Sequence, residues 1–173
     1  MKNFFSLLSL LFFLMSNSQK LTSYVNPFVG TKNMGHTFPG ATAPFGMVQL
    51  SPETNQVAYA IDGKYNPETY RYCSGYQYDD KIIFGFSHTH FSGVGHSDLG
   101  DFLMMPTNGK LNLEPGKADV PKSGYHSQFS KITEKASPGF YEVMLDDYGI
   151  KAELTASDRV GFHRYTFPKS SES

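Results

Sequence analysis

The densest group of side chains able to do chemistry lies in the segment Ser87 to Asp101. Three of the six histidines of the chain, His88, His90 and His96, fall within this one stretch. If the preceding strand continues to His90, the side chains of His88 and His90 project from the same face. With His96 or Asp98 they would then supply nitrogen and oxygen ligands to a zinc ion that keeps an open position. This arrangement would make the protein a zinc hydrolase, although neither the spacing nor a helix matches a known zinc signature.

The same segment allows two other interpretations. In one, it is a loop that faces a polar ligand and offers imidazole and hydroxyl groups for hydrogen bonds. The glycines at 93, 95 and 100 would let its backbone approach such a ligand closely. In the other, the histidines are structural residues that hydrogen-bond within a glycine-rich loop.

Other catalytic signatures fail on inspection. The sequence of residues 85–89, Gly-Phe-Ser-His-Thr, resembles a nucleophile elbow but has threonine where the second glycine is required. Residues 93–98 begin like a dinucleotide-binding loop but lack its third glycine. Cys73 is the only cysteine, so it forms no disulfide within the chain, and we interpret it as a small apolar core residue. Asp98 and Asp101 lie on either side of Gly100, but the sequence around them does not match a calcium-binding loop.

The elements that position these residues are expected to be strands. Short apolar runs at residues 45–50, 82–86 and 102–105 suit a buried sheet. From residue 126 onward an antiparallel meander is expected, with strands at 140–145 and 161–167 and a turn at 146–149. Between them, residues 150–156 alternate strictly between apolar and polar side chains, which is typical of a strand with one buried and one solvent-exposed face. The pattern predicts an all-β fold, an antiparallel β-sandwich.

The composition agrees with this fold class. The chain has 173 residues, which suits one domain, with 15 Phe, 11 Tyr, 16 Gly, 10 Pro and no Trp. Fifteen Lys and Arg residues balance sixteen Asp and Glu residues. The formal net charge of −1 lacks the basic excess of a protein that grips phosphate backbones, so no nucleic-acid partner is expected.

The N-terminus has the layout of a secretory signal peptide over residues 1–18. Lys2 provides the charged region, residues 4–15 form an apolar run, and Ser16 and Ser18 are small residues at the cleavage site. The apolar run is shorter than the roughly 20 residues of a membrane span. We therefore expect a mature domain of residues 19–173 that is secreted or periplasmic and is not held in a membrane after cleavage.

Four blocks of sequence carry a family resemblance. They are Val-Asn-Pro-Phe-Val-Gly-Thr at 25–31, Gly-His-Thr-Phe-Pro-Gly-Ala-Thr-Ala-Pro-Phe-Gly-Met-Val-Gln-Leu-Ser-Pro at 35–52, Cys-Ser-Gly-Tyr at 73–76 and Gly-Phe-Ser-His-Thr-His-Phe-Ser-Gly at 85–93. Together they resemble the opening motifs of glycoside hydrolase family 92, a family of exo-acting α-mannosidases. The resemblance runs from about residue 24 to residue 167.

The resemblance implies an N-terminal β-sandwich that packs against a larger (α/α)₆ toroid, with an α-mannoside glycan bound between them. It also implies inversion at the anomeric carbon and dependence on calcium. The resemblance places the family's acid, base and most calcium ligands in the toroid, and we expect this chain to stop before that domain. It therefore assigns no catalytic residue and no metal ligand here and implies little activity for this piece alone. It does imply that this domain lines the substrate cleft, with the candidate substrate-binding residues His36, Tyr76, Ser87, His88, His90 and Asp98. A stand-alone carbohydrate-binding module, or the zinc hydrolase built on His88, His90 and His96, are the alternatives.

Overall fold

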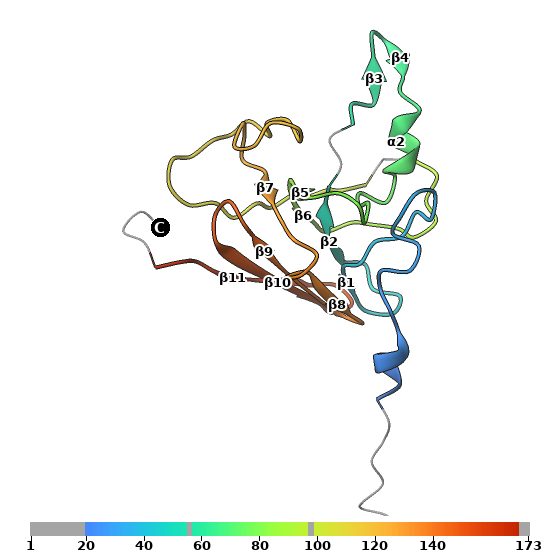
Figure 1. The fold of residues 1–173 in the computed structure, drawn as a ribbon. Coiled ribbons are helices and arrows are strands. Elements are labelled where there is room, and N and C mark those ends of the chain that lie inside the picture. The colour runs from blue at the N-terminus through green and yellow to red at the C-terminus, as the bar shows by residue number, and fades with distance from the viewer. Residues whose placement is uncertain (1–19, 55–56, 97–98, 170–173) are drawn as a thin grey trace, which may run out of the picture.

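The structure is a computed structural model that describes residues 20–54, 57–96 and 99–169. Strands dominate it, and the expected all-β fold is confirmed (Figure 1). The elements are the 3₁₀ helix η1 (Leu21–Tyr24), the short helix α2 (Glu68–Arg71) and the strands β1 (Ala41–Thr42), β2 (Gln49–Glu53), β3 (Ala60–Ile61), β4 (Lys64–Tyr65), β5 (Ile82–Ile83), β6 (Gly85–Ser87), β7 (Ser127–Gln128), β8 (Lys135–Ser137), β9 (Phe140–Leu145), β10 (Ile150–Ala156) and β11 (Gly161–Thr166).

The C-terminal half forms a four-stranded antiparallel sheet in the order β11-β10-β9-β8. β9 occupies the predicted residues 140–145, and β10 occupies 150–156. Ile150, Ala152 and Leu154 are buried, as the alternation predicts, because they share the face of β10 that is covered by the second sheet. The predicted meander is therefore confirmed.

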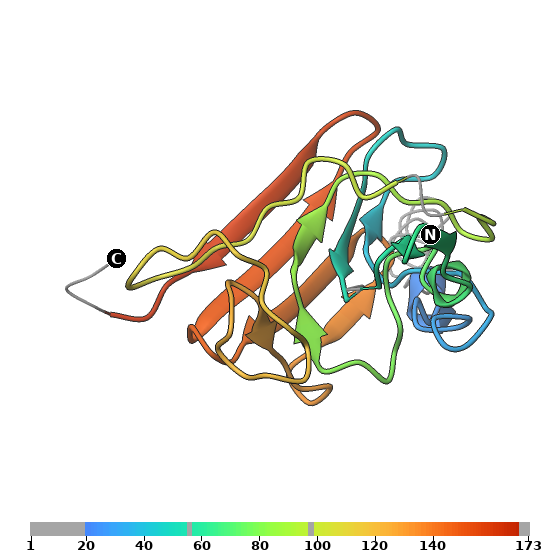
Figure 2. The ribbon, with the colours of Figure 1, turned by 90° about the horizontal axis from the view of Figure 1, so that it is seen from above.

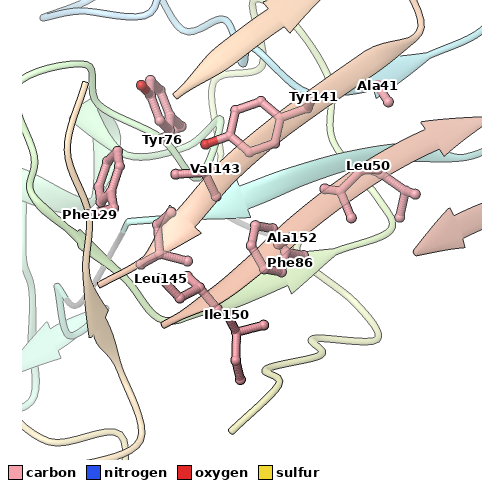
Figure 3. Close-up of a cluster of buried hydrophobic side chains, with 12 residues drawn as sticks. Ala41, Leu50, Tyr76, Phe86, Phe129, Tyr141, Val143, Leu145, Ile150 and Ala152 are labelled. Carbon is pink, nitrogen blue, oxygen red and sulfur yellow. The ribbon is translucent and has the colours of Figure 1, made fainter. Parts of the chain in front are cut away.

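A three-stranded sheet, β1-β2-β6, lies over the four-stranded one (Figures 1 and 2). Its residues Leu50 and Phe86 point into the space between the layers, and with Tyr141, Val143 and other side chains of β9 and β10 they form the core (Figure 3). Burying a side chain of this size stabilises the fold by about 1.5–3 kcal/mol. The two layers are thus held together mainly by apolar packing.

The N-terminal strands differ in detail from the prediction. The strand expected at 45–50 begins only at Gln49, because Phe45 has a left-handed backbone (φ +59°) and a fully exposed ring. The run at 82–86 is divided between β5 and β6, which pair with different partners. The run at 102–105 forms only an isolated bridge between Met104 and Phe86.

The core also contains a polar cluster. Tyr76 and Tyr141 are both fully buried, and their hydroxyls donate hydrogen bonds to the carboxylate of Glu134. Lys131 Nζ donates to the same carboxylate at 2.9 Å and to Tyr76 Oη at 2.6 Å. Each buried polar group of this cluster therefore has a partner.

The outer face of the three-stranded sheet is covered by α2 and by loops, and the hairpin β3–β4 projects beyond them (Figure 1). Among the described residues, no helix is both long and apolar enough to cross a membrane. The signal-peptide prediction for residues 1–18 lies outside the described residues.

Candidate functional site

The pleat of β2 and β6 divides their side chains between two environments. Leu50 and Phe86 face the core, so Glu53 and Ser87, which have the opposite parity, face the loops on the other side. β6 ends at Ser87, and the chain then turns so that His90 comes back under the same face. Alternation along two paired strands thus places a carboxylate and a hydroxyl together, and the turn adds an imidazole.

Glu53, Ser87 and His90 form one hydrogen-bonded group. The Ser87 hydroxyl donates to Glu53 Oε1 at 2.5 Å, and His90 Nε2 lies 2.8 Å from the same oxygen. His90 Nε2 also lies 3.1 Å from Ser87 Oγ. His90 and Ser87 are almost completely buried, and the Glu53 side chain is 13% exposed. The group is therefore rigid but reaches solvent through its carboxylate.

The second ring nitrogen of His90 is held by the backbone. Nδ1 lies 2.8 Å from the backbone carbonyl oxygen of Gln49, which can only accept, so Nδ1 carries a proton. In a serine hydrolase triad the imidazole joins the hydroxyl and the carboxylate through opposite nitrogens. Here Ser87 and Glu53 both meet Nε2, so the group is not such a triad. It is suited to holding hydroxyl groups of a ligand.

The surroundings of Glu53 leave little spare room. A side chain at Gly75 would collide with its carboxylate, and one at Gly100 would come within 3.3 Å of Oε1. Gly75 also has a left-handed backbone (φ +79°), which glycine adopts without strain. A cavity of about 40 Å³ between Glu53, Cys73 and His90 is large enough for a water molecule or a ligand hydroxyl.

A much larger groove of about 700 Å³ lies on the other side of His90. Its walls are mostly apolar and include the rings of Phe38, Phe45 and Phe91. Phe38 also packs against the His90 ring, with 4.9 Å between the ring centroids. His90 therefore separates a small polar cavity from a wide apolar groove, an arrangement common in ligand sites.

His36 is the next predicted site residue, and its geometry is unusual. It is buried and has a left-handed backbone (φ +50°), which is uncommon outside glycine. Its ring stacks edge-on against Tyr70 at 4.7 Å, and its Nε2 has no hydrogen-bond partner among the described residues. His36 thus carries backbone strain and a free buried nitrogen near the loop of Gly93, whose amide donates to its carbonyl oxygen.

The structure does not bring the predicted zinc ligands together. His88 keeps the parity of Phe86 and points between the layers, whereas His90 points to Glu53, so the two do not share a face. His96 lies beside Tyr59, with 5.9 Å between the rings. Within residues 20–54, 57–96 and 99–169, no group of three His, Cys, Asp or Glu side chains could hold a metal ion. The zinc cluster of His88, His90 and His96 is therefore wrong, and Asp98 lies outside the described residues.

Two other residues singled out in the sequence belong to the interior. Tyr76 was expected at the substrate cleft, but it is fully buried and its hydroxyl is bound to Glu134, so we correct its role to a structural one. Cys73 is buried, as expected, and burial raises the pKa of its thiol. Its Sγ lies 2.8 Å from the carbonyl oxygen of Val94.

Glu53, the centre of the hydrogen-bonded group, was not predicted from the sequence. Glu53 follows Ser51 and Pro52 at the end of β2 and belongs to no recognisable motif. The available signal was its parity with Gln49, opposite to that of the core residue Leu50, in a strand that starts later than expected. Its partner Ser87 is brought close only by the pairing of β2 with β6.

Comparison with known proteins identifies the fold. Residues 24–173 match the glycosyl hydrolase family 92 N-terminal domain. The chain is 30% identical over 146 residues to an uncharacterized secreted glycosidase of Arthroderma benhamiae, covering 84% of this chain and 17% of that protein.

Solved structures agree with this match. The GH92 α-mannosidase BT3965 of Bacteroides thetaiotaomicron, in complex with mannoimidazole, is 47% identical with a TM-score of 0.79 over 88% of this chain and 19% of that one. The GH92 inverting mannosidase BT2199 of the same organism is 25% identical with a TM-score of 0.62, covering 90% of this chain and 19% of that one. The chain thus spans about a fifth of the length of these relatives. With sequence and structure in agreement over nearly all described residues, this chain belongs to the N-terminal domain family of glycoside hydrolase family 92.

Proposed function

We propose that this chain is the cleft-forming N-terminal domain of a secreted, calcium-dependent, inverting exo-α-mannosidase that acts on α-mannoside glycans. The observation that carries the proposal is the 47% identity to an α-mannosidase that was solved with mannoimidazole. The name of the Arthroderma benhamiae relative, a secreted glycosidase, supports export.

In this function, the group of Glu53, Ser87 and His90 would position the substrate. The Glu53 carboxylate can accept hydrogen bonds from sugar hydroxyls, and it is held in place by the Ser87 hydroxyl and by His90. Because these partners are nearly buried, the carboxylate is oriented before the ligand arrives. Glu53, Ser87 and His90 are therefore proposed as positioning residues.

The group is not a complete hydrolytic centre. An inverting glycosidase uses two carboxyl groups about 6.5–9.5 Å apart, an acid and a base. Among the described residues, the hydrogen-bond partners of Glu53 are a hydroxyl and an imidazole, not a second carboxyl. We propose that the acid, the base and the calcium ligands come from the part of the relatives that this chain does not span.

The test compares the complete polypeptide with this chain alone. The complete polypeptide should hydrolyse an aryl α-mannoside in the presence of calcium, and this chain alone should not. Failure of the complete polypeptide would refute the α-mannosidase proposal, and turnover by the chain alone would refute the division of labour. Binding of a mannoside by this chain alone, as tightly as by the complete polypeptide, would favour a carbohydrate-binding module.

The positioning role is tested by Glu53→Gln and His90→Ala in the complete polypeptide. Glu53→Gln removes the charge and one acceptor oxygen, and His90→Ala removes the imidazole; losing one such buried hydrogen-bonding partner costs about 1–3 kcal/mol, so kcat/KM should fall by roughly 5- to 150-fold. The matched control is Asp79→Asn, which removes an exposed ion pair with Lys32 and should leave kcat/KM unchanged. Equal losses of melting temperature without a loss of kcat/KM would show that the group is only structural.

A further inference from the structure

Two histidines from different layers of the sandwich contact each other through their Nε2 atoms. His88 follows β6 and keeps the parity of Phe86, and His163 on β11 pairs with Leu154 and shares its face toward the other sheet. Their Nε2 atoms lie 3.2 Å apart, and their rings are tilted by 35° with 4.9 Å between centroids. The two residues are 75 positions apart, so only the closed sandwich brings them together.

The other nitrogen of each ring is held by a hydrogen bond. His88 Nδ1 lies 3.0 Å from the carbonyl oxygen of Phe102, and His163 Nδ1 lies 2.7 Å from Tyr165 Oη. Metal-binding histidines typically have their second nitrogen fixed in this way, which sets the tautomer and aims the ring. The Tyr165 hydroxyl can either donate to His163 Nδ1 or accept from Nδ1–H, so it can hold either tautomer of the ring.

The spacing of the Nε2 atoms suits a shared metal ion. Zinc lies about 2.0–2.1 Å from imidazole nitrogens, and at a tetrahedral angle two such nitrogens are separated by about 3.3–3.4 Å. The observed separation of 3.2 Å is close to this value. Both residues are half-buried, so the pair lies near the surface of the domain rather than in its core.

We propose that His88 and His163 form a two-histidine site for a borderline transition-metal ion such as Cu²⁺, Ni²⁺ or Zn²⁺, with water at the remaining positions. Without metal, His163 Nε2–H donates to His88 Nε2, and Tyr165 donates to His163 Nδ1. On binding, the proton of His163 moves to Nδ1 and is donated to Tyr165 Oη, so each ring presents a lone pair and no net proton is released. Imidazole nitrogens do not suit Ca²⁺, so this site is independent of the proposed mannosidase function.

The test is to titrate the full chain with each metal salt alone and to follow binding by calorimetry. One equivalent should bind, with Cu²⁺ tighter than Ni²⁺ or Zn²⁺, and Ca²⁺ should not compete. The electron paramagnetic resonance spectrum of the Cu²⁺ form should show two nitrogen ligands. Tyr165→Phe, which removes only the oxygen that orients His163, should weaken binding by roughly 10-fold.

Loss of a ligand should have a larger effect. His163→Gln, on the outer strand β11, should weaken Cu²⁺ binding by more than about 100-fold. His96→Gln is the matched control, because His96 is an exposed histidine elsewhere and its replacement should leave the affinity unchanged. The proposal is overturned if His163→Gln binds Cu²⁺ as tightly as the parent, or if the parent shows one nitrogen ligand or no binding. Since the spectrum of the parent decides the nitrogen count, the test does not depend on how well the His163→Gln variant folds.

Discussion

Glu134 shows how a single carboxylate organises the interior of this domain. It is 1% exposed in its side chain and receives two tyrosine hydroxyls as well as the ammonium of Lys131. Lys131 in turn lies over the rings of Phe129, Tyr76 and Tyr78, at 4.3–4.8 Å from their centroids. Burial lowers the pKa of Lys131, and the nearby Glu134 opposes that shift. The carboxylate is therefore the only full negative charge that directly contacts this ammonium among the described residues.

Glu134→Gln should be strongly destabilising, because it leaves Lys131 without its counter-charge in a mostly buried setting. Breaking a buried pair in this way costs about 3–5 kcal/mol. The control is Glu142→Gln on β9, whose partners Lys135 and Lys151 are 70% and 39% exposed, and which should cost about 0.2–1 kcal/mol. Urea unfolding of both variants measures the difference, and equal losses would show that the buried charge has no special role.

The packing of Gly75 against Glu53 can be separated from its backbone conformation. Gly75 and Gly63 have similar left-handed angles, φ +79° and +74°, but a side chain at Gly63 would meet nothing within 4 Å. Gly63→Ala should therefore show only the backbone cost, about 1–2 kcal/mol. Gly75→Ala should lose more stability than that, because its methyl group displaces the Glu53 carboxylate. Equal losses in thermal unfolding would mean that the carboxylate moves aside freely.

At the scale of the elements, the sequence predicted the second half of the fold better than the first. β9 and β10 are long, adjacent in the chain and joined by a short turn, so local alternation alone defines them. β1 is two residues long, and β2 pairs with β6 across a long separation in sequence, for example between Pro52 and Phe86. Such pairing depends on packing between layers, which no local pattern encodes.

The candidate site, like the fold, could be predicted only where local sequence defines it. Ser87 and His90 stand out because they lie in a motif rich in polar residues, and both are in the hydrogen-bonded group. Glu53 does not, because its importance arises only when β2, β6 and the turn after Ser87 meet. The shared face predicted for His88 and His90 failed because β6 ends at Ser87.

The edge of the four-stranded sheet should respond to acid through Glu153. Arg164 on β11 donates to both carboxylate oxygens of Glu153 on β10, at 2.6 and 2.7 Å, and this lowers the pKa of Glu153 from 4.5 to about 2. A carboxyl with a lowered pKa stabilises the fold above its ordinary value of 4.5 and loses that effect as the pH falls toward 2. In Arg164→Gln the melting temperature should therefore fall less between these two pH values.

The control for this titration is Arg159→Gln, which removes the same charge from the exposed turn before β11. Its melting temperature should follow the parent at every pH. If Arg164→Gln and the parent show the same acid profile, the ion pair does not contribute to stability.

At the scale of the whole molecule, the apolar groove is a surface on which apolar side chains remain exposed to solvent. It measures about 700 Å³, and the ring of Phe45 on its wall is fully exposed. Exposed apolar patches of this kind mark surfaces that another body covers. The large share of each relative that this chain does not span is consistent with such a covering.

Phe45→Ser should reduce the binding of an apolar dye and the tendency of this chain to self-associate. Its melting temperature should change little, because surface substitutions usually alter stability by less than about 0.5 kcal/mol. Ile132→Ser, at a residue that is 90% exposed but does not line the groove, is the control and should leave dye binding unchanged. This interpretation would be contradicted if the parent is monodisperse by light scattering and shows no dye binding by fluorescence.

The central place of β10 also has a kinetic consequence. β10 is paired along its length with β9 on one side and β11 on the other, and its inner face is covered by the first sheet. Its backbone amides should thus exchange with deuterated solvent only when the whole sheet opens, whereas the short pairs β3–β4 and β5–β7 can open locally. Because its neighbours are close in sequence, the meander should also form early in folding, and the β2–β6 pair should dock onto it later. The hydrogen-bonded group of Glu53, Ser87 and His90 would then be among the last parts of the domain to assemble.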